Sequence, residues 1–245
     1  MHIWGLFVAA LHLDGFAMRL FYFQEVSPMR TSTRRLTESA MLLALAIVLE
    51  MLSKAVIPNL PFGGQITLAS MLPVVLISYR HGIKWGLVSG FCYSLIEMVI
   101  GVKNVTAAFQ PGTFGDGVMI LNGLAMCLLD YVLAFTCLGL GGLFRDKVKN
   151  AGVSLMLGSV LALFCRYLCH VASGAILYGT WAEWFFTQEG FPAWGAALVA
   201  NVAPEALAWV YSAVYNGMYM APEICITALA AFFLAKVPGI VTKES

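Results

Sequence analysis

Charged residues are what this sequence lacks most. Asp, Glu, Lys and Arg make up only 11% of its 245 residues, whereas soluble domains carry about 25%. Hydrophobic residues account for 60% of the chain, and mean hydropathy is +0.84. So little charge cannot cover a water-facing surface of this size, which excludes a soluble globular fold. The formal net charge of +1 also provides no basic field for nucleic acid. We therefore expect a membrane protein without a nucleic-acid partner.

Several chemical motifs are missing as well. The sequence contains no GxxxxGK[ST] phosphate loop, so we expect no ATP hydrolysis by that route. It also lacks HExxH, GxSxG and aspartate-rich motifs, which argues against protease, hydrolase and prenyltransferase activity. Its six cysteines form no CxxC pair and no Cys/His cluster at zinc spacing, so buried free thiols are expected. These absences predict a chain that is not an enzyme and holds no metal or cofactor.

The apolar runs predict an all-α membrane protein, a bundle of six transmembrane helices, because each helix needs about 20 mostly apolar residues. The runs are 40–57, 66–79, 85–100, 118–143, 153–178 and 219–237. The second is short and Pro73 interrupts it, so we expect it to tilt or kink.

The distribution of Lys and Arg predicts the orientation of this bundle. Ten of the fourteen basic residues precede the first run, follow the last, or join runs two to three and four to five. Basic residues concentrate on the cytoplasmic side, so both termini are expected in the cytoplasm. Residues 179–216 contain three Glu but no Lys or Arg and are expected outside. The expected location is the plasma membrane, with several passes.

Residues 1–30 do not fit the pattern of spans. Their apolar stretch, 3–11, is too short to cross a bilayer, and no basic region precedes it as in a signal peptide. An Arg-rich sequence follows Met29, so we interpret 1–30 as an extension and expect the native start at Met29. An interfacial N-terminal helix is the alternative. Residues 31–245 are expected to form a single membrane domain.

Ionisable side chains within the expected spans are functional candidates, because burying a charge in a bilayer costs several kcal/mol. They are Glu50, Glu97, Asp130, Arg166, His170 and Glu223. Arg166 and His170 are four residues apart and share a helix face. Arg166 could instead stabilise the bundle by pairing with Asp130, Glu97 or Glu223. For Glu50, near the end of its span, we expect a solvated position.

Carboxylates combined with tyrosines favour a flat cationic ligand, through charge pairing and cation–π contacts. An Asn amide adds one donor and one acceptor for a heterocycle edge. The pattern therefore predicts a cationic aromatic small molecule, although the tyrosines could equally form an interfacial belt. A proton-coupled carrier, with Glu97, Asp130 and His170 as relay, is the alternative. An intramembrane hydrolase using His170 has no nucleophile motif to support it.

Small residues at four-residue spacing allow helices to approach closely. Gly82, Gly86 and Gly90 show this spacing, and internal packing or a partner contact would explain it equally well. Ala40 and Ala44 show it on the first run, where we expect a partner subunit.

These residues resemble the thiamine-specific S subunits of energy-coupling factor (ECF) transporters. The resemblance covers nearly all of 31–237. Its motifs lie in 36–44, 66–73, 80–86, 129–135, 138–145, 166–170, 173–174, 211–217 and 222–223.

The resemblance implies a six-helix S component that binds thiamine in an outward-facing pocket. Such subunits dock on a transmembrane coupling protein that works with two cytoplasmic ATPases, so ATP is used only by the partners. Matched position by position, Asp130 would face the cationic ligand. Polar contacts would come from His170, Tyr211 and Asn216. Tyr178 would stack on the rings of thiamine.

Three further positions complete the match. Tyr93 is the second position at which the resemblance implies a ring that stacks on the ligand. The face formed by Ala40 and Ala44 would dock on the coupling protein.

The sequence departs from the family pattern in three ways. Tyrosine replaces the tryptophan of some relatives, which leaves room for a thiamine analogue or precursor. Asp130 is one methylene shorter than the glutamate that some members use. The outer segment 179–208 is longer than usual and rich in aromatics. We expect it to form an aromatic belt or interfacial helix, with a lid as the alternative.

Overall fold

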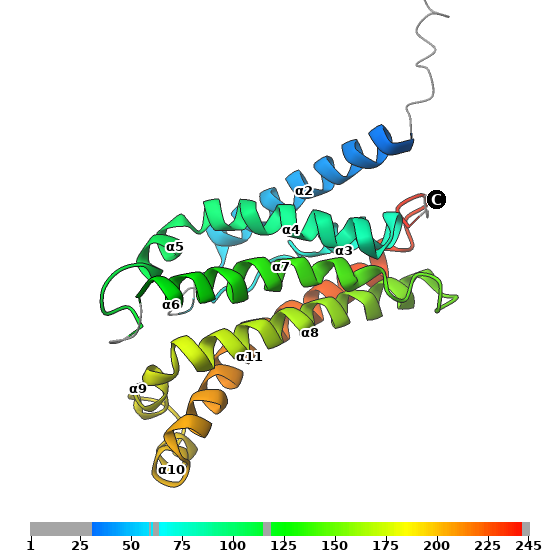
Figure 1. Cartoon of the computed structure of the whole chain (residues 1–245). Helices are drawn as coiled ribbons and strands as arrows, with labels where there is room; N and C mark the ends of the chain where they lie inside the picture. Colours follow the sequence, from blue (N-terminus) through cyan, green and yellow to red (C-terminus); the bar gives the residue numbers. More distant parts are fainter. Residues whose placement is uncertain (1–30, 59, 61–63, 115–118, 242–245) are drawn as a thin grey trace, which may run out of the picture. The chain divides into compact units, whose positions relative to one another are not determined.

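The computed structural model describes residues 31–58, 60, 64–114 and 119–241. Every regular element in these ranges is a helix (Figure 1), so the all-α prediction is confirmed for this part of the chain. The expectations for residues 1–30 lie outside it. In chain order the elements are α2 (Thr31–Val56), α3 (Leu72–His81), α4 (Ile83–Ile100), α5 (Val102–Ala108), α6 (Met119–Met126), η2 (Cys127–Leu133), α7 (Ala134–Thr136), η3 (Cys137–Gly142), α8 (Ala151–Leu177), η4 (Gly179–Trp181), α9 (Ala182–Thr187), α10 (Trp194–Asn201) and α11 (Pro204–Leu234).

The chain forms two compact units, Met1–Glu38 and Ser39–Ser245. In the first, residues 31–38 are the beginning of α2, and Arg34 Nε donates to Glu38 Oε1 at 3.1 Å. The second unit contains every other described element.

Five helical stretches in the described residues are long and apolar enough to cross a membrane. They are Thr31–Val56, Ile83–Ile100, Met119–Gly142, Ala151–Leu177 and Pro204–Leu234.

The second predicted span, 66–79, is only partly helical. Helix α3 begins at Leu72, with Pro73 in its first turn, where a missing N–H costs nothing. Its 10 residues extend about 15 Å at 1.5 Å per residue, roughly half the hydrocarbon thickness. Residues 64–67, ahead of α3, have no regular structure.

The last helix begins well before the predicted residue 219. Ala203 has extended backbone and Pro204 opens α11, a position that suits proline. Hydropathy missed this start because polar residues such as Asn216 interrupt the apolar run. Consequently 204–208, predicted as outer segment, belong to α11, and Tyr211 and Asn216 lie within the helix.

Two glycines of α4 pack inside the bundle. A Cβ on Gly86 would lie 2.8 Å from Ser78 Cα, and one on Gly90 would lie 2.7 Å from the Phe135 carbonyl oxygen. Gly82, at φ +90°, separates α3 from α4 in a conformation that L side chains rarely adopt. Internal packing therefore explains Gly86 and Gly90.

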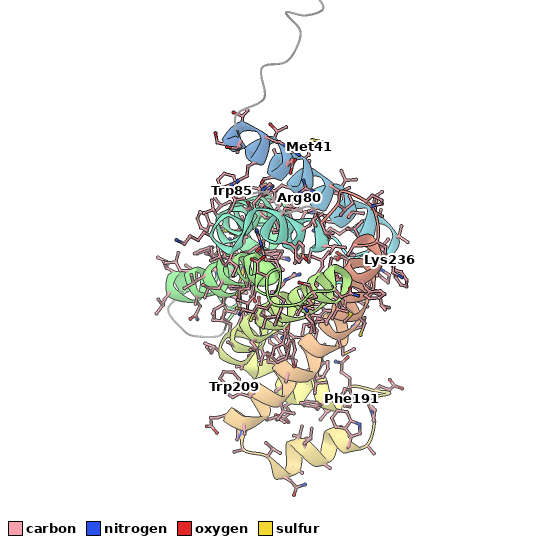
Figure 2. All side chains as sticks on the ribbon, turned by 90° about the vertical axis from the view of Figure 1, so that its right-hand side faces the viewer. Met41, Arg80, Trp85, Phe191, Trp209 and Lys236 are labelled. Atoms are coloured by element: carbon pink, nitrogen blue, oxygen red, sulfur yellow. The ribbon has the colours of Figure 1, made fainter. Side chains whose placement is uncertain are left out.

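The α2 face that carries Ala40 and Ala44 is exposed. Met41, labelled in Figure 2, and Val48 are 67% and 52% exposed on the same helix. This apolar face has room for lipid or another protein.

The two ends of the second unit differ in composition. The α8 start and residues 239–240 lie at one end of the helices, with α9 and α10 at the other (Figure 1). At the first end Arg80 Nη1 donates to the carbonyls of Gly239 and Ile240, at 3.0 and 2.7 Å, and Arg145 Nη1 donates to the Arg80 carbonyl at 3.2 Å. Exposed Trp184 and Trp194 belong to the other end.

Candidate ligand-binding site

Asp130 lies in the π-helical turn η2, within the long helical stretch 119–142. A π turn holds one more residue than an α turn and occurs often at functional sites. The Asp130 side chain is 21% exposed. A carboxylate inside an apolar bundle is thus left partly accessible.

Two side chains from one face of α8 hold this carboxylate. Ser173 Oγ donates to Asp130 Oδ2 at 2.6 Å, and His170 Nδ1 lies 2.9 Å from Asp130 Oδ1. His170 and Ser173 are three residues apart and so face the same way. Each carboxylate oxygen has one protein partner here and keeps further capacity to accept.

The neighbour of His170 determines its tautomer. Arg166 Nε donates to His170 Nε2 at 3.2 Å. Arginine has only donors, so Nε2 must accept, and the ring proton lies on Nδ1, from which it is donated to Asp130. His170 is therefore neutral, and Asp130 is the negative member of the pair.

Arg166 does not make the carboxylate pairing that the sequence left open. Within the described ranges no Asp or Glu oxygen lies within ion-pair distance of Arg166. Its guanidinium stands 4.5 Å from the ring centroid of Phe135, a cation–π contact. Arg166 reaches Asp130 only through His170.

Asn216 connects α11 to α8. Its Nδ2 donates to the carbonyls of His170 and Ser212, at 3.2 and 2.9 Å, and its Oδ1 accepts from Tyr219 at 2.6 Å. Only 5% of Asn216 is exposed. In this conformation its amide positions the backbone at His170, and one lone pair on Oδ1 remains.

Tyr211, Tyr215 and Tyr219 recur every four residues along one buried face of α11. Successive ring centroids are 6.0 and 6.1 Å apart. The Tyr215 hydroxyl accepts from Gly64 N at 3.2 Å. These three residues form what we call the tyrosine ladder, which leads from Tyr211 to the Asn216 partner Tyr219.

Tyr178 follows α8 directly and packs edge-to-face on Phe114 at 5.1 Å. Burial, and secondarily the negative charge of Asp130, raises the pKa of the Tyr178 phenol. Tyr178 therefore stays neutral, in the electrostatic vicinity of Asp130.

Tyr93, the second predicted stacking residue, has no hydrogen bond or ring contact with Asp130, His170 or Asn216 in the described part of the chain. It is 0% exposed, and its ring packs on Phe135 with 5.4 Å between centroids. It offers a ligand no surface in this conformation.

The structure thus links Asp130, His170 and Asn216 directly, and Tyr211 through the tyrosine ladder. Sequence reasoning missed Ser173 and Tyr219 as members. Both were detectable from spacing, because Ser173 is three residues after His170 and Tyr219 is four after Tyr215.

A second polar cluster lies around Glu223. Its carboxylate accepts from Thr67 N at 2.5 Å and from Thr67 Oγ1 at 2.6 Å. Ser70 Oγ joins Thr67 Oγ1 and Glu50 Oε2, both at 2.8 Å, and Lys54 Nζ is 3.1 Å from Glu50 Oε1. The solvated position expected for Glu50 is wrong, since it is 6% exposed. This cluster fixes the non-helical residues ahead of α3.

All six cysteines are free thiols, as predicted. The burial expected for them is found at Cys127 only, because Cys92 and Cys225 are exposed and the other three are partly exposed. In the ranges that the structure describes, no group of three or more His, Cys, Asp or Glu is arranged to hold a metal ion.

Several apolar helices around a fixed, partly accessible carboxylate define a multi-pass membrane protein with a polar cluster inside its bundle. The family model described as "Thiamine transporter protein (Thia_YuaJ)" matches residues 36–204, and the chain belongs to this family.

Two relatives and one solved structure agree with this assignment. The chain is 32% identical over 209 residues to the thiamine transporter ThiT of Bacillus subtilis (strain 168), covering 82% of this chain and 89% of the relative. It is 23% identical over 179 residues to ThiT of Lacticaseibacillus paracasei, covering 68% and 79%. A solved structure of ThiT from Listeria monocytogenes has the same fold, with a TM-score of 0.58 and 19% identity, over 85% of this chain and 97% of that one. The resemblance drawn from the sequence is confirmed, and the family is one of membrane transporters rather than enzymes.

Proposed function

We propose that this chain binds thiamine outside the cell, as the S component of an ECF-type importer, and releases it inside. Membership of the thiamine transporter family supports the substrate. Both kinds of contact expected for a flat cation, a carboxylate and tyrosine rings, occur around α8 and α11.

One observation carries the proposal, namely the Asp130 carboxylate held by His170 and Ser173 while 21% of its side chain stays exposed. Since His170 is neutral, Asp130 can balance the positive thiazolium ring of thiamine. Tyr178 adds a ring face for cation–π contact, worth about 2 kcal/mol when desolvated. Tyr211 is 2% exposed, so its ring face would become available only through a rearrangement as the ligand enters.

The proposed topology has six passages, with residues 64–71 and α3 together as the second, and both termini in the cytoplasm. The basic end of the second unit supports this orientation, because Arg80 and Arg145 lie there beside residues 239–240. The opposite end, with α9 and α10 (Figure 1), carries Glu183 and exposed tryptophans, as expected for an outer interface.

Energy for transport would come from partners, because the sequence has no phosphate loop. The proposed partners are a transmembrane coupling protein and two ATPases. The exposed α2 face with Ala40 and Ala44 is the proposed docking surface, since small residues allow close helix approach. No cofactor is proposed for this chain itself.

Calorimetric titration of the detergent-purified protein tests the binding step. We expect wild type to bind thiamine and to reject riboflavin. Asp130→Asn keeps the shape of the side chain but removes its charge, and should weaken binding by about 100-fold, as for loss of a desolvated charge contact of about 3 kcal/mol. The control is Glu183→Gln at an exposed position of α9, which should change little. Equal affinity for wild type and Asp130→Asn would refute the site.

Uptake into liposomes tests the coupling step. We expect accumulation of thiamine only when the coupling protein, ATPases and ATP are present. Accumulation by liposomes that contain this chain alone would support the proton-coupled carrier instead.

A further inference from the structure

The outer segment 179–203 contacts the tyrosine ladder through one aromatic ring. Phe185 on α9 packs edge-to-face on Tyr211, with 5.2 Å between centroids, and on Tyr215 at 6.2 Å. Phe185 itself is 8% exposed. Among the described ring pairs, Phe185 is the residue of this segment that contacts the tyrosine ladder.

A continuous path leads from this contact to the proposed site. Tyr215 packs on Tyr219 at 6.1 Å, and the Tyr219 hydroxyl donates to Asn216 Oδ1 at 2.6 Å. Asn216 Nδ2 in turn donates to the His170 carbonyl at 3.2 Å. These contacts join the rings of Tyr211 and Tyr215 to the backbone at His170.

We infer that Phe185 is a positioning residue for ligand binding, which holds the rings of Tyr211 and Tyr215 in the orientation that receives a cationic aromatic ligand. The inference rests on the proposed thiamine site. Edge-to-face pairs are directional, so Phe185 fixes the tilt of both tyrosine rings. The face of an aromatic ring is the part that attracts a cation, and its tilt therefore decides the strength of binding.

Phe185 belongs to a wider aromatic cluster of the outer segment. Phe185 also packs on Phe186 at 5.2 Å and Phe191 at 5.3 Å, and Phe191 contacts Trp194 at 5.0 Å. Figure 2 shows Phe191 near the end of the second unit that carries α9 and α10. The long outer segment thus acts on the site from outside, through an aromatic cluster of its own.

Phe186 provides a matched control. It is the next residue on α9, is 1% exposed, and its described ring partners are Phe185, Phe191 and Trp194. Phe186→Ala removes the same ring from the same helix but leaves both tyrosine contacts intact.

The test is thiamine titration of the full-length detergent-purified protein, by calorimetry, in wild type and single variants. We expect Phe185→Ala to weaken binding about tenfold, as for the loss of two edge-to-face contacts. Phe186→Ala should stay within about threefold of wild type, and Phe185→Tyr, which restores a ring, within about twofold. If alanine at 185 prevents purification, Phe185→Leu and Phe186→Leu give the same comparison with most of the volume kept.

A double-mutant cycle separates positioning from general packing. In a Tyr211→Leu background the effect of Phe185→Ala should shrink to about threefold or less, because its main contact is already gone. Equal weakening by Phe185→Ala and Phe186→Ala, or fully additive effects in the cycle, would overturn the inference. If wild type binds thiamine and Phe185→Ala binds it equally well, the inference alone is overturned. If wild type binds no thiamine, the proposed function is overturned as well.

Discussion

Removal of the Ser173 hydroxyl isolates one of the two contacts that hold Asp130. Ser173 is 0% exposed, and its Oγ lies 2.6 Å from Asp130 Oδ2. In Ser173→Ala no water from bulk can take the place of the hydroxyl at its buried position. The carboxylate loses a charge-assisted hydrogen bond, of which the net value is about 1.5–3 kcal/mol.

Part of this lost free energy should appear as weaker ligand binding, because a carboxylate without the Ser173 hydrogen bond must be ordered when the cation binds. A loss of about 1.4 kcal/mol corresponds to a tenfold increase in Kd. We therefore expect Ser173→Ala to bind thiamine about 5- to 30-fold more weakly, measured by calorimetric titration.

Ser159 on the same helix gives the matched control. It is also 0% exposed, but its Oγ donates to the Leu155 carbonyl of its own helix at 2.9 Å. Ser159→Ala is therefore the same chemical change at the same burial without a contact to Asp130. Equal Kd values for wild type, Ser159→Ala and Ser173→Ala would refute the reasoning that α8 fixes the carboxylate for its ligand.

Three further predictions follow from the packing. Gly174→Val should prevent recovery of monodisperse protein in size-exclusion chromatography, because a Cβ at this position would collide with Ser212 of α11. The control Gly217→Ala should be recovered normally, since a Cβ there has no neighbour within 4 Å. Equal recovery of the two variants would contradict this packing. The two carboxylate oxygens of Glu223 each accept a buried hydrogen bond, and Glu223→Gln replaces one of these oxygens with a donor. The variant should lower the free energy of unfolding by about 1–3 kcal/mol, measured by thermal denaturation. The control Glu205→Gln, at an exposed position, should change it by about 0.5 kcal/mol or less. Ala44→Leu should keep thiamine affinity but reduce co-purification with the coupling protein at least severalfold, and undiminished co-purification would exclude this face as the docking surface.

The sequence predicted the bounds of α4 and α8 well, because charged residues or glycines flank both apolar runs. The runs 85–100 and 153–178 agree closely with Ile83–Ile100 and Ala151–Leu177. The sequence failed at 66–79 and at the start of α11, where a proline lies in the first turn of each helix. Polar residues in the first half of α11 made this helix look short on a hydropathy scale.

Composition and hydropathy alone singled out the ionisable members of the candidate site, whereas Tyr211 and Asn216 followed from the family resemblance. Charge within an apolar span singled out Asp130 and His170, and their hydrogen bond at 2.9 Å joins them. The saturation of the Asn216 amide and the full burial of Tyr93 depend on how the helices pack. Spacing along one chain contains no information on such contacts between helices.

The π turn at 127–133 lies between two halves of one membrane-crossing stretch. Asp130 belongs to the turn itself, and the glycines of η3 follow it, where Gly139 packs against the backbone of Leu87. A π turn takes up one residue more than an α turn, so the helix widens at Asp130 while the halves before and after it keep their orientation. The surplus residue thus alters the helix surface at the carboxylate and leaves the close helix contact at the glycines undisturbed.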